Sequence, residues 1–258
     1  MEAPAPEDEL NFCQACTVRN RAICADLETY EIALLNKIGR RRRLEAGESL
    51  MWEGDDAVYV ANVVSGVLKL STQTSDGREQ ILGLAYPSDF LGRPFGNTSP
   101  YNAEALCETV VCVFRRTDFE RFALDHSRLE HKLLERTLSE LDRTRRWMLL
   151  LGRMNAEERL AALLLEIGAR SVAAGCGNSA DADIDRFELP MSRQQIADIL
   201  GLTIETVSRQ LTKMREDGII EIRGRRKVTI CKRGVLEKTR CITGWQPRSG
   251  GWSQNAVV

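Results

Sequence analysis

The sequence lacks the features that mark membrane proteins, exported proteins and enzymes. No apolar run approaches the roughly 18 residues that a membrane-spanning helix needs. The opening MEAPAPEDEL is acidic and has no apolar core, so it is not a signal peptide. His126 and His131 are the only two histidines, and no nucleophile–base pair or phosphate-binding loop is present. We therefore expect a cytoplasmic protein that is not an enzyme and contacts no membrane.

A net charge of −1 over 258 residues also predicts no particular partner for the chain as a whole. The local balance is different. Residues 191–233 contain ten Lys or Arg against five Asp or Glu, a net charge of +5. Such a local excess is typical of a nucleic-acid-binding surface, although a solvated charged face would also produce it.

The pattern of apolar residues predicts an α+β chain with several parts. Residues 44–114 contain short apolar runs punctuated by glycine, with strands expected at 58–64, 67–71 and 80–84 and a hairpin turn at 75–77. Closely spaced short strands favour a β jelly roll. A helical run follows over 117–170, broken near 152–155. We assign 1–28 to a cysteine segment, 29–122 to a β-roll sensor domain, 123–152 to a dimerisation helix, 153–235 to a DNA-binding domain and 236–258 to a disordered tail.

The long helical run carries apolar residues near heptad spacing, which predicts a coiled-coil seam between two copies of the chain. These residues are Leu134, Leu138, Leu141 and Met148. The alternative is a stripe that faces the core of a single chain.

A winged helix-turn-helix is predicted downstream. Ser192 and Gln195 form a capping-box pattern, Gly201 supplies the turn, and Thr203 caps a second helix that ends at Gly218. The following IIEIRGRRKVTI predicts a two-stranded wing.

The second helix would place its N-terminal turn in the major groove of DNA. Arg209 can bind guanine, Glu205 can accept from cytosine, and Ser208 can meet a base edge or a phosphate. Alternatively, Glu205 and Arg209 form an i, i+4 salt bridge. The candidate DNA contacts are Glu205, Thr206, Ser208 and Arg209 at the bases and Lys213, Arg225, Arg226 and Lys227 at the phosphates.

Three cysteines, Cys13, Cys16 and Cys24, lie close together before the β-rich region. In a reducing compartment such a cluster holds a metal more often than disulfides. Thiolate chemistry alone suits zinc and iron–sulfur equally.

Together, the β-rich half, the long helix and the helix-turn-helix resemble the cyclic-AMP receptor protein/FNR (CRP/FNR) superfamily of transcription regulators. The stretch 191–224 looks like the FNR branch, with its E-x-x-S-R pattern at Glu205, Ser208 and Arg209; 77–92 and 152–167 are also similar. The resemblance covers about residues 11–233. It implies a homodimer that binds double-stranded DNA at a site like TTGAT-N4-ATCAA and contacts RNA polymerase around 75–79 and 86–89.

The same resemblance implies oxygen sensing by a [4Fe–4S] cluster on Cys13, Cys16, Cys24 and a fourth cysteine, Cys112. The rival fourth ligand is Cys107. The two lie five positions apart, so on one regular strand they would face opposite sides, and only one could point at the N-terminal cysteines.

Two departures from the superfamily matter. The stretch 92–110 has no Arg-Ser pair to grip a cyclic phosphate, so a cyclic nucleotide is not expected. Thr144 stands where FNR proteins carry an Asp on the dimer helix. Repulsion between the Asp side chains of two copies, which would keep the cluster-free protein monomeric, is therefore in doubt for this chain. Competing hypotheses are a zinc or thiol redox site with the same DNA-binding role, and a cyclic-nucleotide-binding regulator.

Overall fold

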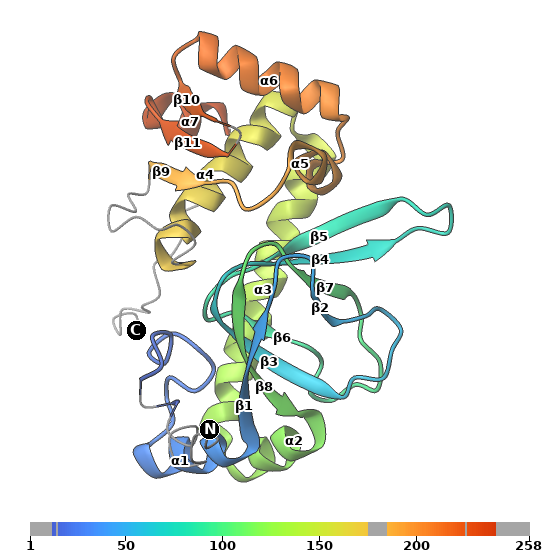
Figure 1. Cartoon of the computed structure of the whole chain (residues 1–258), viewed down its shortest axis with the longest axis vertical. Helices are drawn as coiled ribbons and strands as arrows, with labels where there is room; N and C mark the ends of the chain where they lie inside the picture. The colour runs from blue at the N-terminus through green and yellow to red at the C-terminus, as the bar shows by residue number, and fades with distance from the viewer. Residues whose placement is uncertain (1–11, 14, 175–184, 225, 241–258) are drawn as a thin grey trace, which may run out of the picture.

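The computed structural model describes residues 12–13, 15–174, 185–224 and 226–240 (Figure 1). Most of the predicted N-terminal stretch and linker, and the tail beyond Cys241, lie outside these residues. A β-rich half and a smaller helical half are joined by one long helix (Figure 1). None of the described helices is both long and apolar enough to cross a membrane.

The β-rich half is a roll of two four-stranded antiparallel sheets. The first has the order β1 (Gly39–Leu44), β8 (Thr109–Arg115), β3 (Tyr59–Ser65) and β6 (Phe90–Leu91). The second has the order β2 (Ser49–Met51), β7 (Asn102–Ala105), β4 (Leu68–Gln73) and β5 (Glu79–Ala85). Small and branched side chains fill the space between them, among them Ala61, Val63, Leu68, Ala103 and Val111. The predicted α+β fold with a jelly roll is confirmed.

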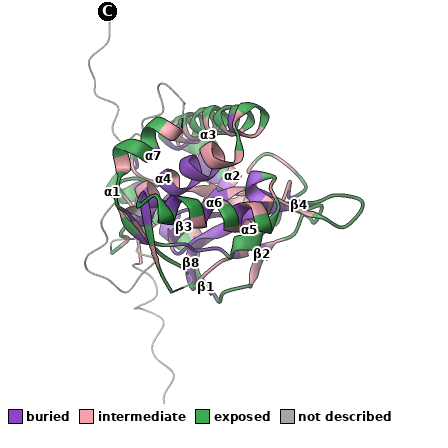
Figure 2. Ribbon diagram, turned by 90° about the horizontal axis from the view of Figure 1, so that it is seen from above, coloured by how far each residue is buried: buried purple, intermediate pink, exposed green. Residues whose placement is uncertain are grey.

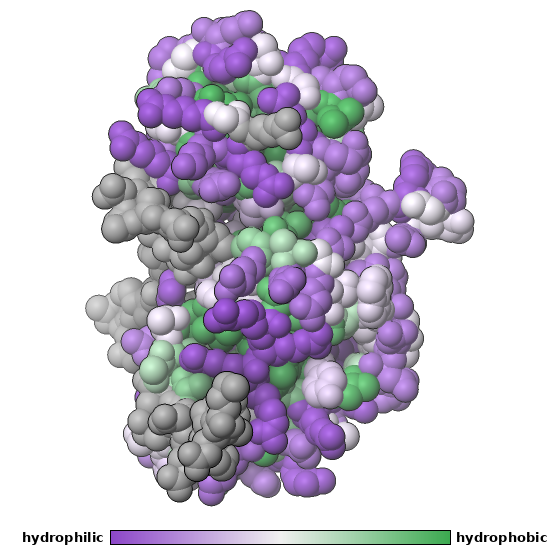
Figure 3. All heavy atoms as spheres, in the orientation of Figure 1, coloured by the Kyte–Doolittle hydropathy of each residue, from purple (hydrophilic) through white to green (hydrophobic). Residues whose placement is uncertain are grey.

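The hairpin predicted at 75–77 joins β4 to β5 and projects from the roll (Figure 1). Gly77 adopts a φ of +84°, a conformation that glycine reaches without a steric cost. The projecting surface is hydrophilic (Figure 3). In contrast, Tyr86 and Ser88, in the second stretch expected to contact the polymerase, are buried.

Three helices pack along the first sheet: α1 (Thr29–Ile38), α2 (Arg116–Asp125) and the long α3 (Ser127–Arg153). Leu129, Leu133 and Leu150 are the buried side chains of α3. The predicted seam residues are instead exposed: Leu134 by 56%, Leu138 by 53%, Leu141 by 43% and Met148 by 68%. Much of α3 faces solvent (Figure 2). The seam is therefore not a core-facing stripe of a single chain.

The helical half begins after a break at residues 154–155, as predicted. Its elements are α4 (Ala156–Ala174), β9 (Arg186–Glu188), α5 (Arg193–Leu200), α6 (Ile204–Glu216), β10 (Ile220–Arg223), β11 (Lys227–Ile230) and α7 (Arg233–Thr239).

Two expectations for this half need correction. The wing has three strands, because β9 pairs with β11 through Phe187 and Val228. The disordered tail was expected from residue 236, but α7 continues to Thr239. Leu236 is fully buried in the domain core, and this burial stabilises the helix.

A buried ionic network joins the two halves. Arg143 on α3 lies 3.2 Å from Glu166 on α4 and donates to the Leu84 carbonyl of β5. Arg170 on α4 binds Asp89 of the roll at 2.7 Å and covers the Tyr86 ring. Burial alone would lower the pKa of Arg143, but Glu166 and the other nearby carboxylates raise it above its usual range. The network therefore connects the roll, the long helix and the helical half.

We expect Arg143→Ala to lower the free energy of unfolding by about 3 kcal/mol, because Glu166 would lose the cation beside it in a buried site. Arg145→Ala is the matched control. Arg145 is exposed on the same helix and pairs, among the described residues, with exposed Asp142, so its loss should cost less than about 0.5 kcal/mol. Urea unfolding of both variants measures the difference, and equal costs would contradict the structural role of the network.

Candidate functional site

The structure brings four cysteines from distant parts of the sequence to one small pocket. Cys13, Cys16 and Cys24 lie in the turns before α1, and Cys112 lies in the middle of β8. Cys112 is buried and the other three are half-buried. Apolar side chains make up much of the remaining wall: Phe12, Val18, Ala22, Ile32, Leu35, Val64 and Phe114.

The N-terminal segment packs against the first sheet through its own apolar and polar contacts. Val18 and Ile23 are almost fully buried, so they anchor the turns that carry the cysteines. The Cys13 N–H donates to Asn36 Oδ1 of α1 at 3.3 Å. Arg41 of β1 donates to the Phe12 carbonyl at 2.9 Å, and its guanidinium lies 5.4 Å from the centre of the Phe12 ring.

Strand register places two polar residues beside Cys112. Arg41 on β1 and Asn62 on β3 are its direct partners across the sheet. Because paired residues of adjacent strands point to the same face, the three form a row under the N-terminal cysteines. The sequence analysis missed Arg41 and Asn62. The available signal for Asn62 was a single amide within the otherwise apolar strand 58–64.

Cys107 lies elsewhere. It precedes β8 and packs against the core that includes Leu84 and Tyr86, away from the N-terminal segment. The assumption that Cys107 and Cys112 share one regular strand is therefore wrong. Of the two, Cys112 lines the pocket together with the N-terminal cysteines.

The pocket disfavours isolated thiolates. Burial, together with the neighbouring Cys16, raises the pKa of Cys13 to about 11. Burial likewise raises the pKa of Cys24 to about 11 and that of Cys112 further still. Redox-active cysteines usually have lowered pKa values, so the raised pKa values of these thiols do not favour a thiol switch.

Four cysteine sulfurs are a donor set that suits either a zinc ion or an iron–sulfur cluster. No three His, Cys, Asp or Glu side chains within the described ranges are close enough to hold one metal ion. Four-coordinate zinc needs every sulfur about 2.3 Å from one point. A [4Fe–4S] cluster is also held by four cysteines, but each binds a different iron, so the sulfurs stand farther apart.

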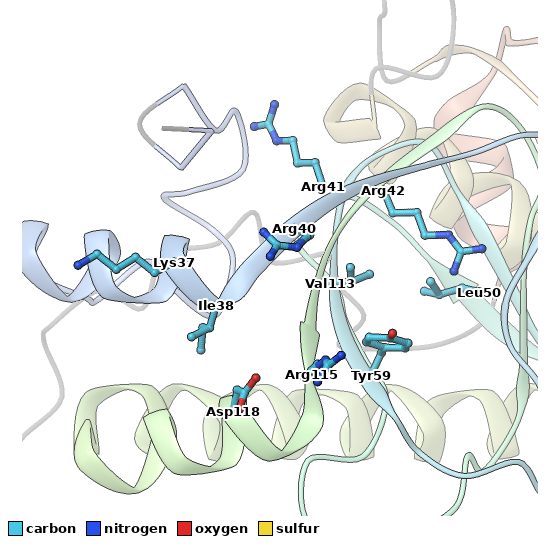
Figure 4. A pocket seen from close by; sticks show the side chains of 10 residues that line it. All are labelled: Lys37, Ile38, Arg40, Arg41, Arg42, Leu50, Tyr59, Val113, Arg115 and Asp118. Atoms are coloured by element: carbon cyan, nitrogen blue, oxygen red, sulfur yellow. The ribbon is translucent and has the colours of Figure 1, made fainter. Parts of the chain in front are cut away.

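A larger cavity of about 560 Å³ lies on the opposite face of the same sheet (Figure 4). Arg40 and Arg42 of β1 and Tyr59, Val113 and Arg115 line it, and no cysteine does. Arg41 borders both cavities, whereas Val113 lines only the larger cavity and Cys112 only the cysteine pocket.

The helix-turn-helix has the expected caps. Gln195 N–H donates to Ser192 Oγ at 3.2 Å, and Ser192 N–H donates to Gln195 Oε1 at 2.8 Å. Gly201 ends α5 with a φ of +61°, and Thr203 Oγ1 accepts from the Thr206 N–H that opens α6. These caps fix the turn that presents α6.

The N-terminal turn of α6 presents the predicted base contacts. Glu205 and Arg209 are exposed, whereas Thr206 and Ser208 are half-buried. No ion pair joins Glu205 to Arg209 in the described part of the chain. Hydrogen bonds from the backbone N–H of Glu205 and from the Thr203 hydroxyl lower the pKa of the Glu205 carboxyl.

The flanking cations differ in their surroundings. Lys213 pairs with Glu157 at 2.6 Å, and Arg226 and Lys227 are exposed on the wing. Arg225 lies outside the described residues. Arg193 of α5 donates to Ser208 at 3.3 Å, so it lies beside the candidate base contacts although the sequence analysis did not include it. Its basic side chain directly after the helix cap was the available signal.

Comparison with known proteins agrees with this architecture. Residues 41–126 match the cyclic nucleotide-binding domain family and residues 158–239 the Crp-like helix-turn-helix domain family. The chain is 42% identical to the transcriptional activator protein FnrL of Cereibacter sphaeroides, over 86% of this chain and 88% of the relative. The chain belongs to the CRP/FNR superfamily. It is therefore a DNA-binding transcription regulator and not an enzyme.

Other members of the CRP/FNR superfamily are also similar. The nitrogen fixation regulation protein FixK of Bradyrhizobium diazoefficiens is 39% identical over 82% of this chain and 87% of the relative. The structure of FixK2 from Bradyrhizobium japonicum superposes with a TM-score of 0.71 and 34% identity, covering 80% of this chain and 98% of that chain.

We expect Ser192→Ala to destabilise the start of α5 by about 1 kcal/mol, because the Gln195 N–H would lose its acceptor. Ser192→Asp, which keeps an acceptor at the cap, should retain most of the stability. Amide hydrogen exchange in α5 measures both. Protection that is unchanged in Ser192→Ala would show that the cap contributes nothing.

Proposed function

We propose that the protein is an oxygen-responsive transcriptional activator of the FNR type, with a [4Fe–4S] cluster held by Cys13, Cys16, Cys24 and Cys112. The observation that carries this proposal is that these four thiols share one pocket while Cys107 lies elsewhere. When bound, the cluster would be the group that oxygen degrades. The likeness to the transcriptional activator protein FnrL supports the activator part of this proposal.

The protein's own contacts offer a route from the cysteine pocket to the dimer helix. Asp26 and Glu28, just after Cys24, pair with Lys132 and Arg128 of α3 at 2.9 and 2.7 Å. Ligation of Cys24 would therefore hold these carboxylates against the first turns of α3. The exposed seam of α3 continues from there, so a firmly held N-terminal segment favours pairing of two α3 helices.

Pairing of α3 would bring two copies of α6 to one face of the dimer. Helix-turn-helix dimers read half-sites about one helical turn of DNA apart. Glu205, Thr206, Ser208 and Arg209 would contact the bases of an inverted repeat like TTGAT-N4-ATCAA. Lys213, Arg225 and Arg226 would contact phosphates, joined by Arg193 because of its position beside Ser208.

The projecting β4–β5 hairpin is the surface we assign to RNA polymerase. It carries residues 75–78 at its hydrophilic, projecting tip (Figures 1 and 3). Nearer its base, Gln80 of β5 donates to the Asp198 carbonyl of α5 at 2.8 Å, so β5 is also attached to the helical half. Residues 86–88 are buried, so the second stretch expected to touch the polymerase is not part of this surface.

Cys112→Ala should abolish the cluster, whereas Cys107→Ala should spare it, because only Cys112 lines the pocket. After anaerobic purification, visible absorption and iron and sulfide counts measure assembly. A colourless wild-type protein that contains zinc would refute the cluster. A cluster that persists in Cys112→Ala but is lost in Cys107→Ala would show that Cys107 is the fourth ligand.

Arg209→Ala should weaken binding to the specific site by roughly 1–3 kcal/mol and relax discrimination at one base pair. Arg215→Ala is the matched control, since Arg215 lies in the last turn of α6 and should not affect base preference. Anaerobic binding to a library of half-site variants measures both. An unchanged base preference in Arg209→Ala would contradict the groove assignment.

A further inference from the structure

Asn62 is a polar residue with an unexplained position. Its side chain is 3% exposed, and its amide oxygen has no hydrogen-bond partner among the described residues. It lines the cysteine pocket and pairs directly with Cys112 across the sheet. A buried amide oxygen without a partner is destabilising, so a purely structural side chain here would be apolar.

Its neighbours on the strand show that an apolar side chain would suit this position. Val60 and Val64 flank Asn62 on the same face of β3, and both are buried in the cluster that contains Cys112 and Phe114. The pocket wall around the amide is largely apolar, and the four cysteine sulfurs are the hydrogen-bond acceptors that the pocket would gain on metal binding.

We propose that Asn62 donates an amide hydrogen bond to a cysteine sulfur that holds the bound cluster and thereby slows oxidation of the cluster by oxygen. The amide must turn its N–H toward the sulfur, which an end-for-end rotation of the side chain achieves. This inference rests on the proposed cluster. Asn62 is a positioning residue, because it acts on the cofactor through a ligand sulfur.

The expected effect follows from charge. A cluster on four thiolates is anionic, and a hydrogen bond to its sulfur stabilises the more electron-rich state. Such a bond raises the reduction potential and makes loss of an electron to oxygen less favourable. Arg41, the other partner of Cys112 in the row, acts in the same direction, because it brings a positive charge to the wall of the same pocket.

The test compares wild-type protein with Asn62→Leu, both purified and reconstituted anaerobically. Asn62→Leu keeps a similar volume but removes the donor. We expect unchanged iron and sulfide counts, a lower midpoint potential and loss of the cluster in air about tenfold faster. Val64→Ala is the matched control, since it alters the packing of the same wall without removing a donor, and it should leave the potential unchanged.

A second measurement separates this role from a structural one. In cluster-free protein, Asn62→Leu should be at least as stable as wild type toward urea, because the unpartnered amide is gone. A destabilised cluster-free variant would indicate that the amide is needed for the fold and would overturn the inference. So would an Asn62→Leu cluster with the wild-type potential and lifetime.

If Asn62→Leu assembles no cluster, Asn62→Ser and Asn62→Ala make the same comparison at a smaller volume, because only Ser can donate. The serine variant should keep its cluster longer in air, and equal lifetimes would overturn the inference. A wild-type protein that binds no cluster refutes the proposed function instead, so the two failures are distinguishable.

Discussion

The alternation of side chains along β8 is the constraint on which the rest of the structure depends. Val111 points into the core of the roll, whereas Cys112 and Phe114 point to the other face. That outer face supports the N-terminal segment, α1, α2 and the beginning of α3. One strand therefore serves two cores, and a shift of its register by one residue would exchange them. The position of Cys112 is consequently fixed by the folding of the whole roll.

Two sets of ion pairs attach α3 to the parts of the chain around it. At its N-terminal end, Lys132 and Arg128 bind the segment that follows Cys24. Toward its C-terminal end, Arg143 binds Glu166 of the helical half and the Leu84 carbonyl of the roll. The exposed seam residues lie between and beside these attachments. The same helix thus contacts the cysteine segment, the roll and the helical half, which makes it suited to couple them.

Much of this arrangement could be predicted from local patterns. The caps at Ser192 and Thr203 and the turn at Gly201 are short-range features, so the sequence alone locates α5 and α6. The third wing strand could not be predicted, because β9 has three residues and is stabilised by pairing with a strand some 40 positions away. Leu236 gave no periodic signal either, since α7 has only seven residues.

The cysteine pocket, too, could be predicted from the sequence only in part. The N-terminal triplet is visible in the sequence, and family resemblance added Cys112. The row that Cys112 forms with Arg41 and Asn62 depends on the register of three strands that are distant in the chain. No local pattern predicts such pairing, because each strand alone specifies only which residues share a face.

Asn62 illustrates why a departure from a local pattern is informative. The neighbouring positions of β3 all carry buried apolar side chains: Val60, Ala61, Val63 and Val64. A strand that is buried on both faces has no stability reason to carry an amide at its centre. Pairing places that amide directly across from Cys112, so the residue that departs from the apolar pattern of β3 lies beside the candidate chemistry. A polar group retained at this position is best explained by what it does for the sulfur beside it.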